Sequence, residues 1–157
     1  MTVITERLII RPFIESDLDT FIEYRNDEAW MIYQDFKGYT KEEYKKMIID
    51  DVIDIHRGVQ LAITDKVTGH LFGDLYVILT NGELWIGYTI HPKHARKGYT
   101  FEAVESLYPW LKAQGVDTIH LSAHANNHAS LNLIKKLGFK ENGIEEEHGD
   151  LAFIKHI

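Results

Sequence analysis

A strand that runs into a basic, glycine-containing loop and then into a helix is the part of this sequence best suited to chemistry. The segment is Ile90-His91-Pro92-Lys93-His94-Ala95-Arg96-Lys97-Gly98-Tyr99-Thr100. The first N–H groups of a helix have no partner inside the helix, and with Arg96 and Lys97 beside them they form a site for an anion. Gly98 lets the backbone approach such a ligand closely. Many strand-to-helix loops carry lysine and glycine, so this segment alone leaves a phosphate site and a plain connection both open.

A hairpin is predicted around Asn81-Gly82, because this dipeptide favours a two-residue turn. One face of this hairpin is a second candidate for a functional site. The resulting register places Asp74 opposite Thr89 and gives the hairpin one apolar face, which includes Leu84, Ile86 and Tyr88 and which we expect to be core. The other face is semi-polar and aromatic. It suits a covered pocket, and solvent or a helix contact is the alternative. Its members are Asp74, Tyr76, Trp85, Thr89 and His91.

Hydrophobic periodicity, caps and turn signals predict the elements that would position these residues. We predict helices from about 16 to 26, from the capping box Thr40-Lys41-Glu42-Glu43 to about 58, from 98 to about 113, and from 127 to 137. Strands are predicted over 7–11, 59–64, 70–79, 83–91, 116–122, 139–147 and 151–157. Pro109 lies inside the third helix and predicts a kink near Glu105. This order of elements indicates an α+β domain with a mixed sheet.

The composition indicates one domain that spans residues 1–157, with 45% hydrophobic and 26% charged residues. The absence of cysteine excludes disulfides, thiolate metal sites and a cysteine nucleophile. The formal net charge of −7 argues against a nucleic-acid partner, and it serves either to attract cations or simply to keep the protein dissolved. Three histidines recur every fourth residue at 120, 124 and 128, but a strand end and a helix cap would not share one face, so we expect no metal.

The sequence contains no apolar run long enough to span a membrane. Its first residues lack the basic region and apolar core of a signal peptide. We therefore expect a cytoplasmic protein with no membrane partner.

Four motifs in series resemble the GNAT superfamily of N-acetyltransferases, and within it the RimJ/RimL-type branch, which acetylates ribosomal-protein N-termini. The first motif is Thr5-Glu6-Arg7-Leu8-Ile9-Ile10-Arg11-Pro12 with Asp17, and the second is Trp85-Ile86-Gly87-Tyr88-Thr89-Ile90-His91-Pro92. The third is Gly98-Tyr99-Thr100-Phe101-Glu102-Ala103, and the fourth is Asn127-His128-Ala129-Ser130 followed by Lys135-Lys136-Leu137-Gly138-Phe139. Any one motif is loose, but the series covers nearly the whole chain in the family's order.

The resemblance implies a GNAT-like mixed, mostly antiparallel sheet of about seven strands flanked by about four helices, splayed between the strands at 83–91 and 116–122. Acetyl-CoA, the implied co-substrate, would lie in that gap without a metal. Its pyrophosphate would meet the loop amides, and its pantetheine would pair with the open strand like an extra strand. The residues assigned to acetyl-CoA are Ile90, Ala95, Arg96, Lys97, Gly98, Tyr99, Thr100, Asn127 and Ser130.

The sequence departs from the family's pattern at several positions. Arg96 replaces a common glycine of the phosphate loop, and Thr100 adds a side chain where close packing is usual. Ile134 stands where many members have a tyrosine that acts as general acid, and Trp85 stands where some RimL-like enzymes have a carboxylate that acts as base. The resemblance therefore leaves both proton-transfer roles unassigned.

Without a cysteine, we expect direct attack of a neutral amine on the acetyl carbonyl. A backbone N–H near Ile90 would stabilise the oxyanion. Asp74 and His91 are the candidate bases, and Ser130 is the candidate proton donor to the leaving thiolate. Asp74 and His91 also have structural explanations, since Asp74 could end a bulge and His91 could be a turn residue.

The predicted acceptor is a primary amine on a protein N-terminus or on a small molecule. An aminoglycoside 6'-N-acetyltransferase or a polyamine acetyltransferase is the alternative within the family, and a non-catalytic acyl-CoA-binding sensor is the alternative from another class. Residues assigned to the acceptor are Trp30, Tyr33, Tyr76, Trp85 and Thr89, with core packing as the competing explanation for the first two. Dimers are common among relatives, so a homodimer is one expected state.

Overall fold

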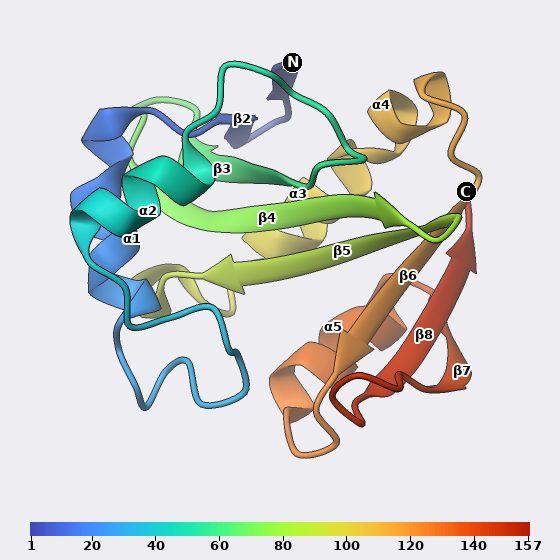
Figure 1. Cartoon of the computed structure of the whole chain (residues 1–157). Helices are drawn as coiled ribbons and strands as arrows, with labels where there is room; N and C mark the ends of the chain where they lie inside the picture. Colours follow the sequence, from blue (N-terminus) through green and yellow to red (C-terminus); the bar gives the residue numbers. More distant parts are fainter.

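One twisted sheet of eight strands forms the centre of the molecule, in the order β1-β2-β3-β4-β5-β6-β8-β7 (Figure 1). This computed structural model describes all residues from 1 to 157. The strands are β1 (Val3–Ile4), β2 (Leu8–Pro12), β3 (Val59–Asp65), β4 (Leu71–Thr80), β5 (Glu83–Ile90), β6 (Thr118–Ala123), β7 (Lys140–Ile144) and β8 (Leu151–His156). The predicted mixed α+β fold is confirmed, and the strand beyond the seven expected is the short β1.

The helices are α1 (Leu18–Arg25), α2 (Lys41–Ile48), α3 (Tyr99–Ser106), α4 (Tyr108–Ala113) and α5 (His128–Lys136). The first two pack on one face of the sheet, over a cluster of eight buried residues that includes Phe21 and Tyr44. The other three cover the opposite face, over a core of 23 buried residues that includes Leu75 and Leu107. None of the helices combines the length and the hydrophobicity that a membrane span requires.

The predicted splay lies between β5 and β6, the one parallel pair of neighbours in the sheet. These strands pair only at Leu84 with Ile119 and at Trp85 with His120. Beyond this point they diverge, and Figure 1 shows them as an open V. The edge of β5 from Ile86 to Ile90 therefore faces a gap instead of a neighbouring strand.

The β4–β5 hairpin has the predicted register, with Thr80 opposite Glu83 and Asp74 opposite Thr89. Its two turn residues both take positive φ, 52° at Asn81 and 77° at Gly82, as the sequence pattern requires. The apolar face is buried in the core. On the other face Asp74, Thr89 and His91 are buried as well, whereas Tyr76 is 39% exposed, so this face is covered only at the end that carries Asp74.

Two helix predictions need correction. The capping box at Thr40 is confirmed, but α2 ends at Ile48 and not near residue 58. The carboxylate of Asp50 accepts the N–H of Val52, and that of Asp54 accepts the N–H of His56. These local bonds satisfy the backbone outside a helix. The predicted kink from Pro109 is a break, because α3 ends at Ser106 and α4 starts at Tyr108.

A buried ion pair ties α1 to β4. Arg25 Nη2 lies 2.6 Å from both carboxylate oxygens of Asp74, and the two residues are 2% and 1% exposed. Tyr24 and Gln60 also donate hydrogen bonds to this carboxylate, over 2.5 and 2.6 Å. Burial and the adjacent carboxylate raise the pKa of Tyr24 well above its ordinary value, so its hydroxyl remains a donor. Both oxygens of Asp74 are thus fully engaged.

We predict that Asp74→Ala lowers the free energy of unfolding by about 3–5 kcal/mol, because it leaves the buried Arg25 guanidinium without a counter-charge. Denaturation in urea measures this loss. The control is Asp19→Asn, which removes the exposed carboxylate that pairs with Lys41 and should leave the midpoint unchanged. Equal effects of the two substitutions would contradict a structural role for the buried pair.

Candidate active site

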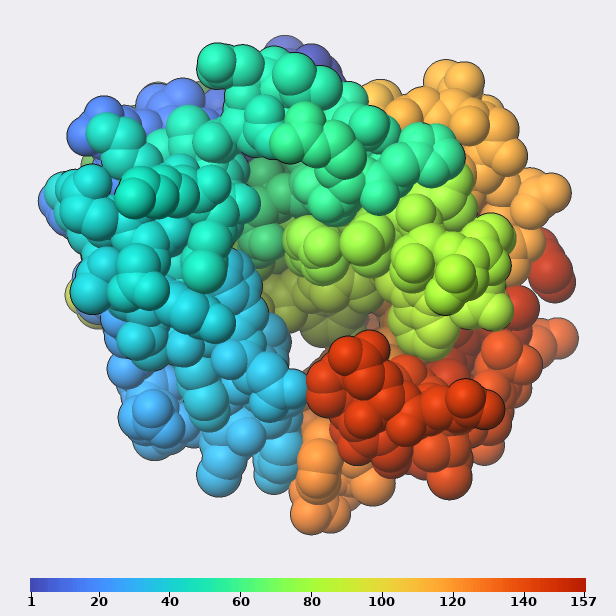
Figure 2. Space-filling model, viewed as in Figure 1, coloured from blue at the N-terminus to red at the C-terminus, as the bar shows by residue number.

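Two cavities open along the gap beside β5 and meet at its centre. One, the hairpin cavity, measures about 600 Å³ and is lined by residues of β4 and β5 such as Tyr76 and Gly87. The other, the loop cavity, measures about 1010 Å³ and is lined by the 92–101 segment and by α5. Figure 2 shows the molecular surface hollowed between residues around 30–40, the hairpin and the β7–β8 turn. Residues that line both cavities are Tyr33, Gln34, Tyr88, Thr89, Asn127 and Ser130.

The far end of the loop cavity is built to hold an anion. Gly98 takes the left-handed conformation (φ 80°) at the start of α3, and the first intrahelical bond runs from Glu102 N–H to its carbonyl. The preceding N–H groups of α3 therefore remain available to a ligand. Arg96, where the resemblance implies glycine in most members, also has a positive φ of 63°. The loop thus keeps the backbone shape that glycine would allow, and it adds a cation.

Arg7, on the connection between β1 and β2, fixes the shape of this loop. Its Nη1 donates to the carbonyl of Lys97 over 2.9 Å, and its Nε donates to Glu102 over 2.7 Å. The same guanidinium lies 4.4 Å from the centre of the Tyr99 ring. Burial alone would raise the pKa of Glu102, but hydrogen bonds from Thr5 and Arg7 bring it below its ordinary value. The carboxylate therefore stays charged and holds Arg7 in place.

The segment between α1 and α2 (residues 26–40) lies against the open edge of β5. Trp30 Nε1 donates to the carbonyl of Ile90 over 2.8 Å, and Gln34 Nε2 donates to the carbonyl of Tyr88 over 3.1 Å. The Thr89 hydroxyl donates to Gln34 Oε1 over 3.0 Å. These side chains satisfy carbonyls that a complete sheet would pair with β6.

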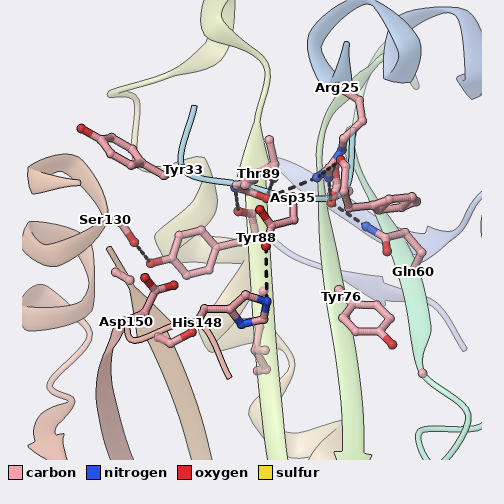
Figure 3. A pocket seen from close by; sticks show the side chains of 18 of the residues that line it. Arg25, Tyr33, Asp35, Gln60, Tyr76, Tyr88, Thr89, Ser130, His148 and Asp150 are labelled. Carbon is pink, nitrogen blue, oxygen red and sulfur yellow. Dashed lines mark hydrogen bonds and ion pairs between the residues drawn. The ribbon is translucent and has the colours of Figure 1, made fainter. Parts of the chain in front are cut away.

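The two cavities meet at a pair of hydroxyl groups, those of Tyr88 and Ser130, which Figure 3 labels. Tyr88 Oη and Ser130 Oγ lie 2.6 Å apart, which joins β5 to the first turn of α5 across the gap. Asn127 Oδ1 accepts the N–H of Ser130 and caps the helix, as the sequence predicts. Burial raises the pKa of Tyr88 to about 12, although the Ser130 hydrogen bond opposes the shift. The sequence assigned Tyr88 to the core face, and its one signal was a hydroxyl among apolar neighbours.

A histidine–carboxylate contact crosses the mouth of the hairpin cavity. His148, in the turn between β7 and β8, places Nε2 3.3 Å from Asp35 Oδ2 on the 26–40 segment (Figure 3). Hydrogen bonding to Glu145 raises the pKa of His148 above its ordinary value, and the nearby carboxylates act in the same direction. Beside it, Tyr33 stacks on His124 with ring centres 4.8 Å apart. The cavity is therefore bordered by two segments that touch.

The structure brings most of the sequence-predicted binding residues together. Every residue assigned to acetyl-CoA lines the loop cavity except Lys97, whose side chain is exposed. Among the residues assigned to the acceptor, Tyr33, Tyr76 and Thr89 line the hairpin cavity, whereas Trp30 lines only the loop cavity. Trp85 lines neither. Its ring stacks on that of His120 with ring centres 5.1 Å apart. Trp85 belongs to the part of β5 that is still paired with β6, so it does not face the gap.

The three candidate catalytic residues have different surroundings. Asp74 lines the hairpin cavity, but its oxygens are held by Arg25 and two further donors. His91 lines neither cavity. Both of its ring nitrogens have partners elsewhere: Nδ1 accepts the N–H of Lys93, and Nε2 lies 3.3 Å from Glu23. Ser130 alone stands where the two cavities meet. Ile134, where the resemblance implies a tyrosine in many members, is fully buried in the core.

Comparison with known proteins agrees with this architecture. A family model described as "Acetyltransferase (GNAT) domain" matches residues 7–140. The uncharacterized N-acetyltransferase YnaD of Bacillus subtilis (strain 168) is 25% identical over 146 residues, which cover 91% of this chain and 85% of that protein.

Solved structures share the whole fold. The ribosomal L7/L12 alpha-N-protein acetyltransferase RimL, in complex with coenzyme A, has a TM-score of 0.82 at 17% identity, over 100% of this chain and 98% of its own. The spermidine N-acetyltransferase of Vibrio cholerae, in complex with CoA and spermine, has a TM-score of 0.78 at 18% identity, over 98% and 96%. These likenesses concern the fold, while the family match extends over most of the sequence. The chain therefore belongs to the GNAT family of acetyltransferases and is an N-acetyltransferase.

Proposed function

We propose that this enzyme transfers the acetyl group of acetyl-CoA to a primary amine by direct attack, as a member of the RimJ/RimL-type branch. The observation that carries the proposal is the meeting of two cavities at Tyr88 and Ser130, inside the gap of the sheet. A thioester that enters through the loop cavity and an amine that enters through the hairpin cavity would come together at this point. Holding two reactants in contact supplies much of the rate in such a reaction.

The loop cavity fits acetyl-CoA, which supplies the acyl group as a thioester when bound. The free N–H groups at the start of α3 and the Arg96 side chain would hold the diphosphate. The backbone N–H groups of Tyr88 and Ile90, on the unpaired edge of β5, would hold the pantetheine. The RimL and spermidine acetyltransferase structures contain coenzyme A, which supports this assignment.

The amine must lose a proton before or during attack, because only its lone pair can form the new bond to the acetyl carbon. Asp74 is paired with Arg25, so we assign it a structural role. It holds α1 against β4 at the hairpin cavity and does not act as the base. The other carboxylates and imidazoles on the hairpin cavity, which could act directly or through water, belong to Asp35, His124, His148 and Asp150. A backbone N–H of β5 near Ile90 would stabilise the oxyanion.

The acceptor is proposed to be a small-molecule amine or an extended peptide end. The contact between His148 and Asp35 narrows the mouth of the hairpin cavity, so a folded surface would not reach Ser130. The RimL and spermidine enzymes named above represent the two classes. We also propose action in the cytoplasm, where acetyl-CoA is available, without a nucleic-acid or membrane partner. A homodimer stays a prediction.

We predict thiol release from acetyl-CoA with at least one amine in a panel of N-terminal peptides, polyamines and aminoglycosides. The protein has no cysteine, so a thiol reagent reports the released CoA without background. Acetyl-CoA at 100 times its Kd should also stabilise the fold by about 2.7 kcal/mol in thermal unfolding. Stabilisation without turnover on any amine would favour an acyl-CoA-binding sensor, and no stabilisation at all would contradict both functions.

Arg96 provides a test of the diphosphate site. Arg96→Gly and Arg96→Ala should both weaken CoA binding about tenfold at low salt, because each removes a charged donor to phosphate. The glycine variant should be about 1 kcal/mol more stable than the alanine variant, because alanine retains a side chain in the left-handed conformation. Titration calorimetry at two salt concentrations measures the affinity, and urea denaturation measures the stability. Unchanged CoA affinity in both variants would remove Arg96 from the site.

A further inference from the structure

We propose that Tyr88 is a positioning residue for acyl transfer that acts through Ser130, so that two linked hydroxyl groups hold the charge that develops on the leaving sulfur. This inference rests on the proposed function, because it concerns the same junction of cavities. It assigns a role to a side chain that the sequence pattern places on the core face of the hairpin.

The splay of the sheet explains why this tyrosine reaches the site. Residues 84, 86, 88 and 90 of β5 share one face, and Leu84 on that face is buried in the core. Pairing with β6 has ended before Tyr88, so its ring extends into the gap and reaches α5 (Figure 3). The hydroxyl then meets Ser130 and not another apolar side chain.

Both partners are held in place from behind. The N–H of Ser130 is bonded to the Asn127 cap, which fixes the first turn of α5. The carbonyl of Tyr88 accepts a hydrogen bond from Gln34, which fixes the strand. A hydroxyl pair with this support does not have to reorganise when charge develops beside it.

The phenol is the stronger acid of the two hydroxyls, so we assign Tyr88 as donor and Ser130 as acceptor in their 2.6 Å bond. The Ser130 proton is then free to turn toward the gap. Burial raises the pKa of Tyr88 to about 12, so the phenol keeps its proton at neutral pH and polarises Ser130 without ionising. Ile134 is fully buried and offers no hydroxyl to the gap.

The step balances without any net proton loss from Tyr88. The amine nitrogen forms a bond to the acetyl carbon, and its surplus proton goes to a base or to water. The carbon–sulfur bond breaks with its electron pair on sulfur, where the Ser130 O–H donates to the negative charge. The thiolate takes its proton from solvent as CoA departs, and both hydroxyls end unchanged.

The kinetic test compares Tyr88→Phe with a matched control. We expect Tyr88→Phe to lower kcat about 10–100-fold while the KM for acetyl-CoA stays within about threefold. The substitution weakens the hydrogen bond from Ser130 to the sulfur, and this bond matters only when charge develops on the sulfur in the transition state. Ser130→Ala should lose at least as much, and the double variant should be no slower than Ser130→Ala. Tyr108→Phe is the control, because Tyr108 has a pKa also raised to about 12 by burial, lacks a hydrogen-bond partner and lies outside both cavities. Its kcat should equal that of the wild type.

A second measurement does not depend on turnover. Because the chain has no cysteine, bound CoA is the one thiol in the sample, and the pH profile of its alkylation by iodoacetamide reports its pKa. The midpoint should rise by about one pH unit in Tyr88→Phe and in Ser130→Ala, since each loses one stabilising interaction with the thiolate. The midpoint in Tyr108→Phe should not move. Thermal unfolding with and without CoA verifies that each variant folds and binds.

The outcomes separate the inference from the proposed function. Equal kcat and equal alkylation profiles for Tyr88→Phe and the wild type would overturn the inference and leave acetyl transfer intact. A wild type that binds CoA but acetylates no amine would overturn the proposed function, and the alkylation profile would still decide the role of the hydroxyl pair. If Tyr88→Phe does not fold, an unshifted profile in Ser130→Ala overturns the inference. No binding of CoA overturns both.

Discussion

The early end of parallel pairing between β5 and β6 is the constraint on which this enzyme depends. Two residue pairs join the strands, and the remaining length of β5 presents backbone amides and side chains to a gap. An unpaired strand edge inside a protein is costly unless its polar groups find partners. Trp30 and Gln34 satisfy two of its carbonyls, and the other groups are left for an amide-bearing ligand. The gap is therefore both a defect in the sheet and the place where the proposed ligand would bind.

Polar contacts between distant segments hold the walls of this gap. The buried pair of Arg25 and Asp74 fixes α1 against the hairpin. Arg7, more than ninety residues away in the chain, fixes the loop before α3 through Glu102. His148 joins the β7–β8 turn to the 26–40 segment. Because each contact joins segments from different parts of the sequence, the shape of the site depends on the complete fold.

Charge is also divided along the gap in a way that suits two reactants. Arg96 and the N-terminus of α3 give the loop cavity a positive end, whereas the hairpin cavity carries three carboxylates (Asp35, Asp74 and Asp150) against the guanidinium groups of Arg25 and Arg57. A phosphate-bearing ligand and an amine would thus be attracted to different ends. They would meet where the hydroxyls of Tyr88 and Ser130 lie, at the least charged part of the gap.

Local sequence patterns determined the hairpin register and the start of one helix. Turn chemistry at Asn81-Gly82 fixed the hairpin register, and Asn127 fixed the start of α5, because both depend on neighbours within a few residues. The motifs located most of the loop cavity, since the residues assigned to acetyl-CoA lie in two short segments, 90–100 and 127–130. Only the tertiary structure showed that Asp74 is neutralised by Arg25, that His91 lines neither cavity and that Tyr88 meets Ser130. Those results depend on which distant side chains the folded sheet brings into contact, and spacing along the sequence carries no record of that.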